Sequence, residues 1–487
     1  MTDFNLAVGG AALDIQSDSD LEFAPDAMLA MGRAAVERSV AFIAALERSP
    51  SMGDLDVAEL CRSLREPVPE GPSAFEPLLA LLFDQLIPRS FGTAGPGYLA
   101  YIPGGGVYPA ALADFIADVT NRYTGVWNGA PALVQLEANA LEWLREWMHF
   151  PVGTAGLFTT GGSMATFSAI LCARERHLGT DIRSGTLYTS TQGHHCIEKA
   201  AKLAGVFSDR VRLIPVDEQF RMRVDALEAA IAEDRSRGLR PFMVASSAGT
   251  TNTGAVDPLD RIADLCASQG LWHHIDGAYG AFFHLCPELQ LVLRGLPRGD
   301  SLTLDPHKGM FLPYGTGALL VRDGNALREV HAATAGYLPR MQSEFYDPAQ
   351  HGPELSRGFP GLRVWLAVKM FGAARYRAAV AEKRALAVWA AERVANIPGV
   401  VMDAAPQLSL FAFHLEGASL ATQDARNEAT RSLMERVNAR GRVMLTGCAV
   451  DDRYLARVCV LSFRTHLRHL QACVDDITVE AAALIGA

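Results

Sequence analysis

Between residues 156 and 321, short runs of apolar and β-branched residues alternate with stretches of helical periodicity. The expected strands are Thr186–Ser190, Val211–Val216, Met243–Ser247, Leu271–Ile275, Ser301–Leu304 and Ala318–Val321. The expected helices between them are Ser163–His177, Cys196–Ala204, Asp225–Arg237 and Pro258–Gln269. Such alternation is typical of a mostly parallel sheet covered by helices on both faces. Ligands of these sheets bind at the carboxyl ends of the strands.

The N-terminal part of the chain predicts helices without a compact core of their own. Apolar residues recur at helical spacing over residues 27–46, directly after the start signal Pro25-Asp26. A linker with two prolines follows at residues 65–71, and a second helical stretch ends near Pro88. We expect this segment, residues 1–92, to pack on another surface such as a partner subunit.

The C-terminal part predicts a second, smaller α/β domain. After a polar stretch with several glycines and prolines at residues 332–361, a long helical region leads into further elements. These are a strand over Ser409–His414, a helix over Asp424–Arg440 and a strand over Val458–Phe463. We therefore expect a large domain over residues 93–370 and a small domain over residues 371–487.

The composition is that of an ordinary folded protein, with 49% hydrophobic and 20% charged residues among 487. A chain of this length can form roughly two to four domains with large cores. The 44 basic residues against 54 acidic ones give a net charge of -10. This charge disfavours nucleic acid and anionic membrane surfaces as partners.

Three features bear on the cellular compartment. No apolar run approaches the roughly 18 residues of a membrane-spanning helix. The N-terminus is acidic up to its first basic residue, Arg33, unlike an export signal. The eight cysteines are widely spaced and form no C-x-x-C pair, which indicates reduced thiols. We expect a cytoplasmic protein that has no membrane partner.

A lysine in an unusual place is the first candidate for chemistry. Lys308 follows the predicted strand Ser301–Leu304 in the segment Asp305-Pro306-His307-Lys308. Partial desolvation at such a strand end would lower the pKa of the amine and make it nucleophilic toward an aldehyde. Taken alone, the segment is more typical of a surface lysine in a turn.

Two further segments change that balance. Asp276 ends the predicted strand Leu271–Ile275, where a carboxylate is costly unless a cation such as a protonated pyridine pairs with it. The alternative is an aspartate that caps the next helix. The glycine turn in residues 159–166 opens a helix, and its free N–H groups suit a phosphate, although many strand-to-helix turns are similar.

Together these segments supply a phosphate site, a carboxylate and a lysine, which are what pyridoxal 5'-phosphate (PLP) needs. From about Tyr98 to Thr465 the sequence resembles the group II PLP-dependent amino-acid decarboxylases, which include aromatic-L-amino-acid and glutamate decarboxylases. Eight motifs stand in the family's order: Gly97–Pro103, Gly162–Thr166, Gln192–His195, Gly249–Thr251, Ile275–Tyr279, Pro306–Lys308, Gly336–Leu338 and Leu461–Thr465.

The resemblance implies fold type I, in which the large PLP-binding domain has three layers, and a homodimer. It also implies a role for each matching residue. Lys308 would bind PLP covalently, Asp276 would pair with the pyridine nitrogen, and His194 would stack on the ring. The remaining cofactor contacts would be Ala278 on the ring's other face, Thr251 at the 3-oxygen, and Ser163, the Met164 amide and His307 at the phosphate. Asp305 stands where some members have asparagine, and it would repel the phosphate unless it turns away or pairs with a cation.

The resemblance further implies decarboxylation of an L-amino acid to the primary amine and carbon dioxide. Tyr337, on the polar stretch before residue 361, matches the tyrosine that supplies the proton to Cα or orders its delivery. Residues that match the border of the substrate side-chain pocket, some of them donated by the partner subunit, are Tyr98, Tyr101, Ile102, Pro103, Tyr123 and Trp127. Their apolar, aromatic character suits an aromatic substrate, and only Arg122 lies near them to meet a second carboxylate.

Several alternatives stay open at this point. The same fold could support transamination, carbon–carbon cleavage, an oxygen-consuming aldehyde synthase, a decarboxylase of acidic amino acids such as glutamate, or a non-catalytic binding protein. A metal site is disfavoured, because His194-His195 and His273-His274 have no carboxylate or cysteine at the spacing of a zinc site. A nicotinamide enzyme is disfavoured because Gly315-Thr316-Gly317 lacks the third glycine and the following helix.

Overall fold

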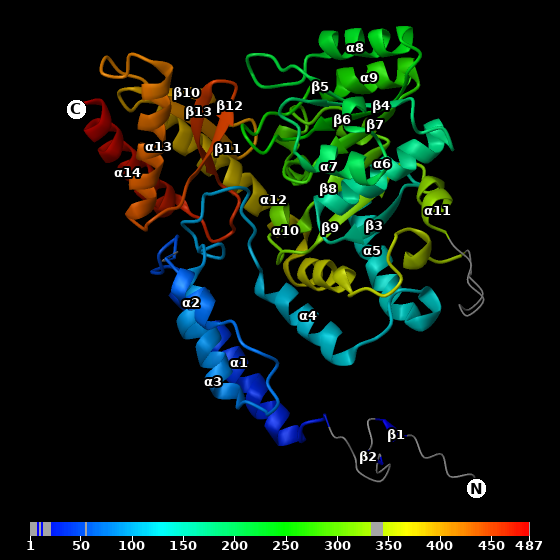
Figure 1. Ribbon diagram of the computed structural model, residues 1–487, viewed down its shortest axis with the longest axis vertical. Helices are drawn as coiled ribbons and strands as arrows, with labels where there is room; N and C mark the ends of the chain where they lie inside the picture. The colour runs from blue at the N-terminus through cyan, green and yellow to red at the C-terminus, as the bar shows by residue number, and fades with distance from the viewer. Residues whose placement is uncertain (1–6, 9–10, 13–20, 54–55, 333–343, 487) are drawn as a thin grey trace. The chain divides into compact units, whose positions relative to one another are not determined.

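The computed structural model describes residues 7–8, 11–12, 21–53, 56–332 and 344–486 (Figure 1). The chain divides into two compact units. One comprises Met1–Arg48 and Gly53–Ser90, and the other comprises Ser49–Met52 and Phe91–Ala487. None of the helices in the described part combines the length and apolar composition that a bilayer crossing requires.

The first unit is helical, as the sequence predicts. Its elements are β1 (Ala7–Val8), β2 (Ala11–Ala12), α1 (Pro25–Ala45), α2 (Ala58–Ser63) and α3 (Phe75–Ala80), which continues as a π-helical turn over Leu81–Leu86. Proline and aspartate in the first turn of α1 favour a helix start there. Among the described apolar residues of this unit, only Leu46 and Leu79 are buried. The unit therefore has very little core of its own.

The second unit is built on a seven-stranded sheet with the order β3-β9-β8-β7-β6-β4-β5. Its strands are β3 (Ala155–Thr159), β4 (Gly185–Ser190), β5 (Val211–Ile214), β6 (Arg240–Ser247), β7 (Trp272–Asp276), β8 (Ser301–Leu304) and β9 (Gly317–Val321). Only β9 runs against the others, because it pairs antiparallel with both β3 and β8. The sheet is therefore mostly parallel, as expected.

Helices cover both faces of this sheet. They are α4 (Tyr108–Thr120), α5 (Pro131–Trp147), α6 (Gly162–Leu178), α7 (Cys196–Leu203), α8 (Val224–Ser236), α9 (Leu259–Gln269), α10 (Pro306–Gly309) and α11 (Asn325–His331). Alternate residues of one strand show the two faces: Met243 packs in the cluster of α6, whereas Val244 packs in the cluster of α8 and α9. The result is a domain of three layers, as expected, with the sheet between two layers of helices (Figure 1).

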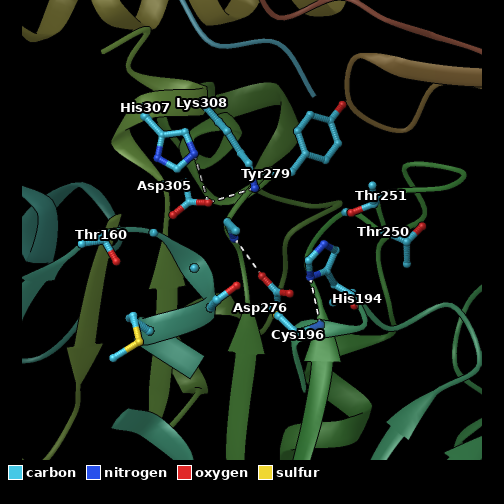
Figure 2. Close-up of a pocket in the computed structure, with 17 residues that line it drawn as sticks. Thr160, His194, Cys196, Thr250, Thr251, Asp276, Tyr279, Asp305, His307 and Lys308 are labelled. Atoms are coloured by element: carbon cyan, nitrogen blue, oxygen red, sulfur yellow. Dashed lines mark hydrogen bonds and ion pairs between the residues drawn. The ribbon is translucent and has the colours of Figure 1, made fainter. Parts of the chain in front are cut away.

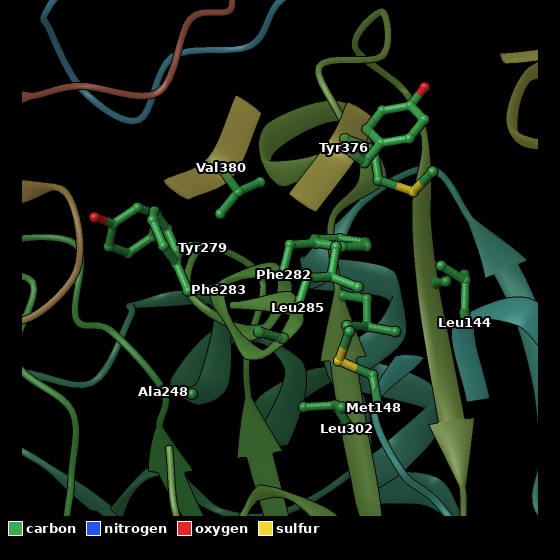
Figure 3. Packing of buried hydrophobic residues seen from close by; sticks show 14 of the residues in the cluster. Leu144, Met148, Ala248, Tyr279, Phe282, Phe283, Leu285, Leu302, Tyr376 and Val380 are labelled. Atoms are coloured by element: carbon green, nitrogen blue, oxygen red, sulfur yellow. The ribbon is translucent and has the colours of Figure 1, made fainter. Parts of the chain in front are cut away.

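The largest apolar cluster lies on the face of the sheet that β7 and β8 share with α5 (Figure 3). Phe282 and Phe283, from the turn after β7, are fully buried there, in the same cluster as Leu144 of α5. Leu302 of β8 belongs to the same cluster. This packing fixes the segment directly after β7, where the candidate site begins.

The C-terminal part forms a four-stranded antiparallel sheet with the order β10-β11-β13-β12. Its elements are α12 (Pro360–Ala395), β10 (Val400–Ala404), β11 (Leu410–Leu415), α13 (Gln423–Ala439), β12 (Thr446–Val450), β13 (Arg453–Cys459) and α14 (Leu467–Ile485). The last strand was predicted too late, over Val458–Phe463. A two-residue turn with Asp451 at φ 54° pairs Val450 with Arg453 and so starts β13 earlier.

Candidate active site

A cavity of about 370 Å³ lies where several strands of the large sheet end (Figure 2). Asp276 is the last residue of β7, Ser247 is the last residue of β6, and Asp305 directly follows β8. The lining residues are Thr160, Gly161, Gly162, Ser163, Met164, His194, Cys196, Ser247, Gly249, Thr250, Thr251, Asp276, Ala278, Tyr279, Asp305, His307 and Lys308. The cavity is thus at the carboxyl ends of the strands, as parallel sheets lead one to expect.

Asp276 brings a nearly buried carboxylate to the end of β7. Its Oδ1 accepts a hydrogen bond from the backbone N–H of Ala278 at 3.1 Å, which fixes the side chain relative to the strand end. Figure 2 shows this carboxylate beside the imidazole of His194. Asp276 therefore offers a negative charge to the cavity and does not cap a long helix, which was the alternative.

His194 lies in the loop between β4 and α7. Its Nδ1 accepts a hydrogen bond from the backbone N–H of Cys196 at 3.2 Å, so the neutral ring carries its proton on Nε2. Burial lowers the pKa of His194, and the charge of Asp276 only partly opposes this effect. A neutral, fixed aromatic ring thus faces the cavity next to a carboxylate.

Lys308 stands in the short helix α10, directly after β8. Its Nζ lies 2.9 Å from Oδ2 of Asp305. Burial by itself would lower the pKa of Lys308, but the charge and hydrogen bond of Asp305, together with the charge of Asp276, raise it above its usual value. The expectation of a lowered pKa is therefore wrong, because Asp305 pairs with a cation, one of the two possibilities considered for it.

The N-terminus of α6 and His307 form one end of the cavity. The first-turn N–H groups of a helix have no intrahelical acceptor, and Gly162 and Ser163 present theirs here. The Met164 amide, expected to hold a phosphate, donates instead to the carbonyl of Gly161 at 3.1 Å. Nδ1 of His307 lies 2.8 Å from the Thr316 carbonyl, to which it donates, so Nε2 is left to face the cavity.

These residues fit PLP. The helix start suits the phosphate, Asp276 suits the protonated pyridine nitrogen, and Lys308 supplies the amine. A contact of His307 with the phosphate stays a prediction, because Nε2 of the neutral ring carries no proton to donate. The carboxylate at the end of β7 and the lysine after β8 are also neighbours across the sheet, because β7 and β8 pair in parallel. A single small cavity therefore contains every group that the cofactor requires.

The loop that contains Thr251 is hydrogen-bonded to a residue of the four-stranded C-terminal sheet. Arg457, a buried residue of β13, donates to the carbonyls of Thr251 and Asn252, the latter at 2.9 Å. The same guanidinium donates to Thr446 Oγ1 at 2.9 Å and to the Tyr101 carbonyl at 3.2 Å. One side chain thus positions a loop of the cavity and the loop that contains Tyr101. Below, we call this set of contacts the Arg457 clamp.

In the described structure, the residues predicted to border the substrate do not line the cavity. Tyr98, Ile102 and Pro103 are buried elsewhere, and Tyr101 is half exposed with a left-handed φ of 50°. Tyr123 is 42% exposed. The ring of Trp127 stacks on Phe345 at 4.8 Å between centroids. Their role stays a prediction. Tyr337 lies outside the described residues.

Several lining residues had no predicted role. Cys196, Ser247 and Tyr279 are examples, and the hydroxyl of Tyr279 lies 3.0 Å from Ser409 Oγ, just before β11. Ser247 and Tyr279 lie at or just after the end of a predicted strand, so their position relative to the strand ends was an available signal. Cys196 is the first residue of α7 and of the helix expected there, so its position at a helix start was a second available signal.

The adjacent histidines of β7 have partners other than a metal. His273 lies 2.8 Å from Ser246 Oγ, and His274 lies 2.8 Å from Ser301 Oγ and 3.3 Å from Thr303 Oγ1. Within the ranges that the structure describes, no group of three or more His, Cys, Asp or Glu side chains could hold a metal ion. These histidines therefore belong to the hydrogen bonding of the sheet.

Acid should destabilise the protein through His274. Burial lowers the pKa of His274 to about 4, whereas the unfolded chain takes up this proton near pH ~6.5. The free energy of unfolding should therefore fall as the pH drops between these values, by about 1.4 kcal/mol per pH unit for this residue. Urea unfolding of His274→Gln is measured at pH 7, 5.5 and 4. Between pH 7 and pH 4 its free energy of unfolding should fall by roughly 3 kcal/mol less than that of the wild type.

The exposed His195→Gln variant is the control and should follow the wild-type pH profile. Because the glutamine substitution can itself change stability, the pH dependence is compared and not the absolute values. An unchanged pH profile in His274→Gln would show that His274 does not gain its proton on unfolding.

Comparisons with known proteins agree with this site. The sequence profile described as "Pyridoxal-dependent decarboxylase conserved domain" matches residues 60–416. An aromatic-L-amino-acid decarboxylase of Bacillus atrophaeus is 33% identical over 453 residues, which cover 92% of this chain and 94% of the relative.

Solved structures show the same similarity. A crystal structure of Oryza sativa TDC with PLP and tryptamine has a TM-score of 0.91 at 26% identity, covering 95% of this chain and 100% of the other. Rhodiola rosea 4-hydroxyphenylacetaldehyde synthase has a TM-score of 0.88 at 25% identity, covering 95% and 99%. The described fold thus has close structural counterparts and belongs to fold type I.

Proposed function

Because the chain belongs to the pyridoxal-dependent decarboxylase family and is a carboxy-lyase that uses PLP, we propose that its substrate is an aromatic L-amino acid. The products are then the primary amine and carbon dioxide. The observation that carries the chemistry is the grouping of Lys308, Asp276 and His194 around one cavity. The similarity to the Bacillus decarboxylase supports the aromatic substrate class.

When bound, PLP supplies an electron sink for the pair released as the bond between Cα and the carboxylate breaks. Asp276 would keep a proton on the pyridine nitrogen, because its buried carboxylate needs a cationic partner. His194, fixed by its bond from Cys196, would cover the ring and exclude water. Lys308 would hold the cofactor through Nζ.

The side chain of the substrate would contact the aromatic set predicted from the sequence. Tyr98, Tyr101, Tyr123 and Trp127 offer ring surfaces and no positive charge. A substrate with a second carboxylate would need a basic partner, and Arg122 is the nearest in sequence. This contrast favours an aromatic amino acid over glutamate.

The direct test is a substrate screen. Purified enzyme with PLP is offered the twenty protein amino acids, dihydroxyphenylalanine and 5-hydroxytryptophan, and carbon dioxide, amine, aldehyde and oxygen uptake are measured together. Equal amounts of carbon dioxide and an aromatic amine are expected. A preference for glutamate would contradict the substrate class. Aldehyde with oxygen uptake would assign instead the activity named for the Rhodiola relative.

Tyr337→Phe tests the source of the proton at Cα, which we propose to be the Tyr337 hydroxyl. The substitution keeps the ring and removes the hydroxyl, so amine formation should slow by roughly 10²–10⁴-fold. Product should shift toward aldehyde, ammonia and hydrogen peroxide, because unprotonated Cα is open to oxygen. Tyr454→Phe, in the small sheet, is the matched control. Unchanged amine output without oxygen uptake would assign the proton to another group, with His194 the next candidate.

We also propose that the enzyme is a homodimer in which the first unit packs on the partner chain. No residue of α1 is buried, and its large apolar side chains Leu29, Val36 and Val40 are about half exposed. Such a face is costly in water unless a partner covers it.

Light scattering should give twice the 52.4 kDa chain mass. The double variant Val36→Asp with Val40→Asp should shift the measured mass toward that of the monomer. A monomeric wild type would refute the proposal.

A further inference from the structure

Asp305 is a buried carboxylate of the cavity that has no role in the reaction described above. It is 2% exposed. Its Oδ2 lies 2.9 Å from Nζ of Lys308, whereas its buried Oδ1 has no hydrogen-bond partner (Figure 2). A buried carboxylate with a single strong partner depends on that partner for most of its stabilisation.

The surroundings of Asp305 offer no substitute for Lys308. Nε2 of His307 is 3.6 Å from Oδ2, and burial lowers the pKa of His307, so that ring is neutral. On the other side, a Cβ added to Gly162 would lie 3.3 Å from Oδ2, so the helix start packs closely there. Among the described residues, Lys308 is therefore the only full positive charge paired with Asp305.

The ion pair between Asp305 and Lys308 requires that Nζ of Lys308 is not bonded to the cofactor. An ammonium group has three N–H donors and a full charge, whereas Nζ bonded to the cofactor carbon carries at most one proton. When a substrate enters, its nitrogen bonds to the cofactor carbon and gives up two of the three protons of its ammonium group, and the bond from that carbon to Nζ breaks. Nζ takes up these two protons and so passes from one N–H to the three of an ammonium group. Atoms and charge balance without any other reactant.

We propose that Asp305 is a catalytic residue that receives Lys308 each time the substrate displaces it from the cofactor. The inference rests on the proposed function, because it requires exchange between Lys308 and a substrate amine. Asp305 stabilises the state in which Lys308 is free. It therefore favours the exchange with substrate and opposes the covalent attachment of the cofactor.

Asp305→Asn should consequently have two effects of opposite sign. Because charge-assisted hydrogen bonds are the strong ones, the apparent KM for the amino acid should rise about tenfold with kcat nearly unchanged. The dissociation constant of PLP, measured by equilibrium dialysis without substrate, should fall about tenfold. General damage to the site would weaken both interactions, so it cannot produce this pattern.

A double-mutant cycle separates this effect from simple repulsion between Asp305 and the phosphate. In the Lys308→Ala background, where no ammonium is present, Asp305→Asn should leave PLP binding unchanged within about twofold. When Lys308 is present, Asp305→Asn should lower the dissociation constant of pyridoxal, which lacks the phosphate, by the same factor as that of PLP. If the tightening persists in Lys308→Ala, or is absent with pyridoxal, Asp305 acts on the phosphate and the proposal is wrong.

Two controls keep the result interpretable. Asp476→Asn removes a fully buried, ion-paired carboxylate of α14 outside the cavity, and it should not change the dissociation constant of PLP. If Asp305→Asn is less thermally stable than this control, Asp305→Ser is carried through the same cycle. Weaker or unchanged PLP binding in both Asp305 variants overturns the proposal. The dialysis arm needs no substrate, so a protein that shows the coupling but releases no carbon dioxide would refute the proposed function alone.

Discussion

Replacing Lys308 with alanine should abolish amine production, with a loss on the order of 10⁴-fold or more. Lys308 is the one lysine among the described residues that line the cavity, so no other amine is placed to bind the cofactor carbon. The variant should still take up PLP without a covalent bond, because the helix start and Asp276 remain. Borohydride treatment followed by peptide mass analysis should find the cofactor on Lys308 in the wild type and on no peptide of the variant.

Lys199→Ala is the matched control for this experiment. Lys199 is an exposed residue of α7, the helix that follows His194. Its replacement should leave turnover and borohydride labelling intact. A labelled peptide with a different lysine in Lys308→Ala would remove Lys308 from its assigned role.

Asp276→Asn should lower kcat by roughly 10²–10³-fold. Asparagine keeps the shape of the side chain and can still accept the hydrogen bond from Ala278, but it cannot stabilise a proton on the pyridine nitrogen by charge. The ring is then a poorer electron sink. Steady-state kinetics should show the loss in kcat, and dialysis should show weaker PLP binding.

Asp300→Asn is the comparison for Asp276→Asn. Asp300 is a partly buried carboxylate that precedes β8, at the amino ends of the strands and away from the cavity. It accepts a hydrogen bond from the backbone N–H of His273 at 2.8 Å. Its replacement should leave kcat close to the wild-type value. Near wild-type kcat in Asp276→Asn would show that the carboxylate is not the partner of the pyridine nitrogen.

Strands and helices with a strong local pattern could be predicted from the sequence. β4 to β9 and α6 to α9 coincide with the expected segments within a few residues. Strand β3 was missed because its short sequence begins with Ala155 and Gly156, and both residue types are depleted in strands. Strands β10 and β12 are edge strands with mixed polarity, so their sequences resemble loops.

The sequence predicted which residues line the cavity better than it predicted how their charges and hydrogen bonds are arranged. All eight residues expected to contact the cofactor line one cavity, because each follows a strand end or begins a helix. The raised pKa of Lys308 could not be predicted, since it depends on whether Asp305 turns toward the lysine three residues later. The hydrogen bond from the Met164 amide to the Gly161 carbonyl could not be predicted either, because it depends on the backbone geometry of the first turn of α6.

The Arg457 clamp limits how this enzyme could be recombined with its relatives. A chimaera that replaced the C-terminal sheet by one without an arginine at this position would leave the carbonyls of Tyr101, Thr251 and Asn252 without their donor. Tyr101 would also lose support for its left-handed backbone, which costs free energy in any residue other than glycine. The C-terminal sheet is therefore not an exchangeable module, and a crossover point that preserves activity must transfer Arg457 together with the two loops that it holds.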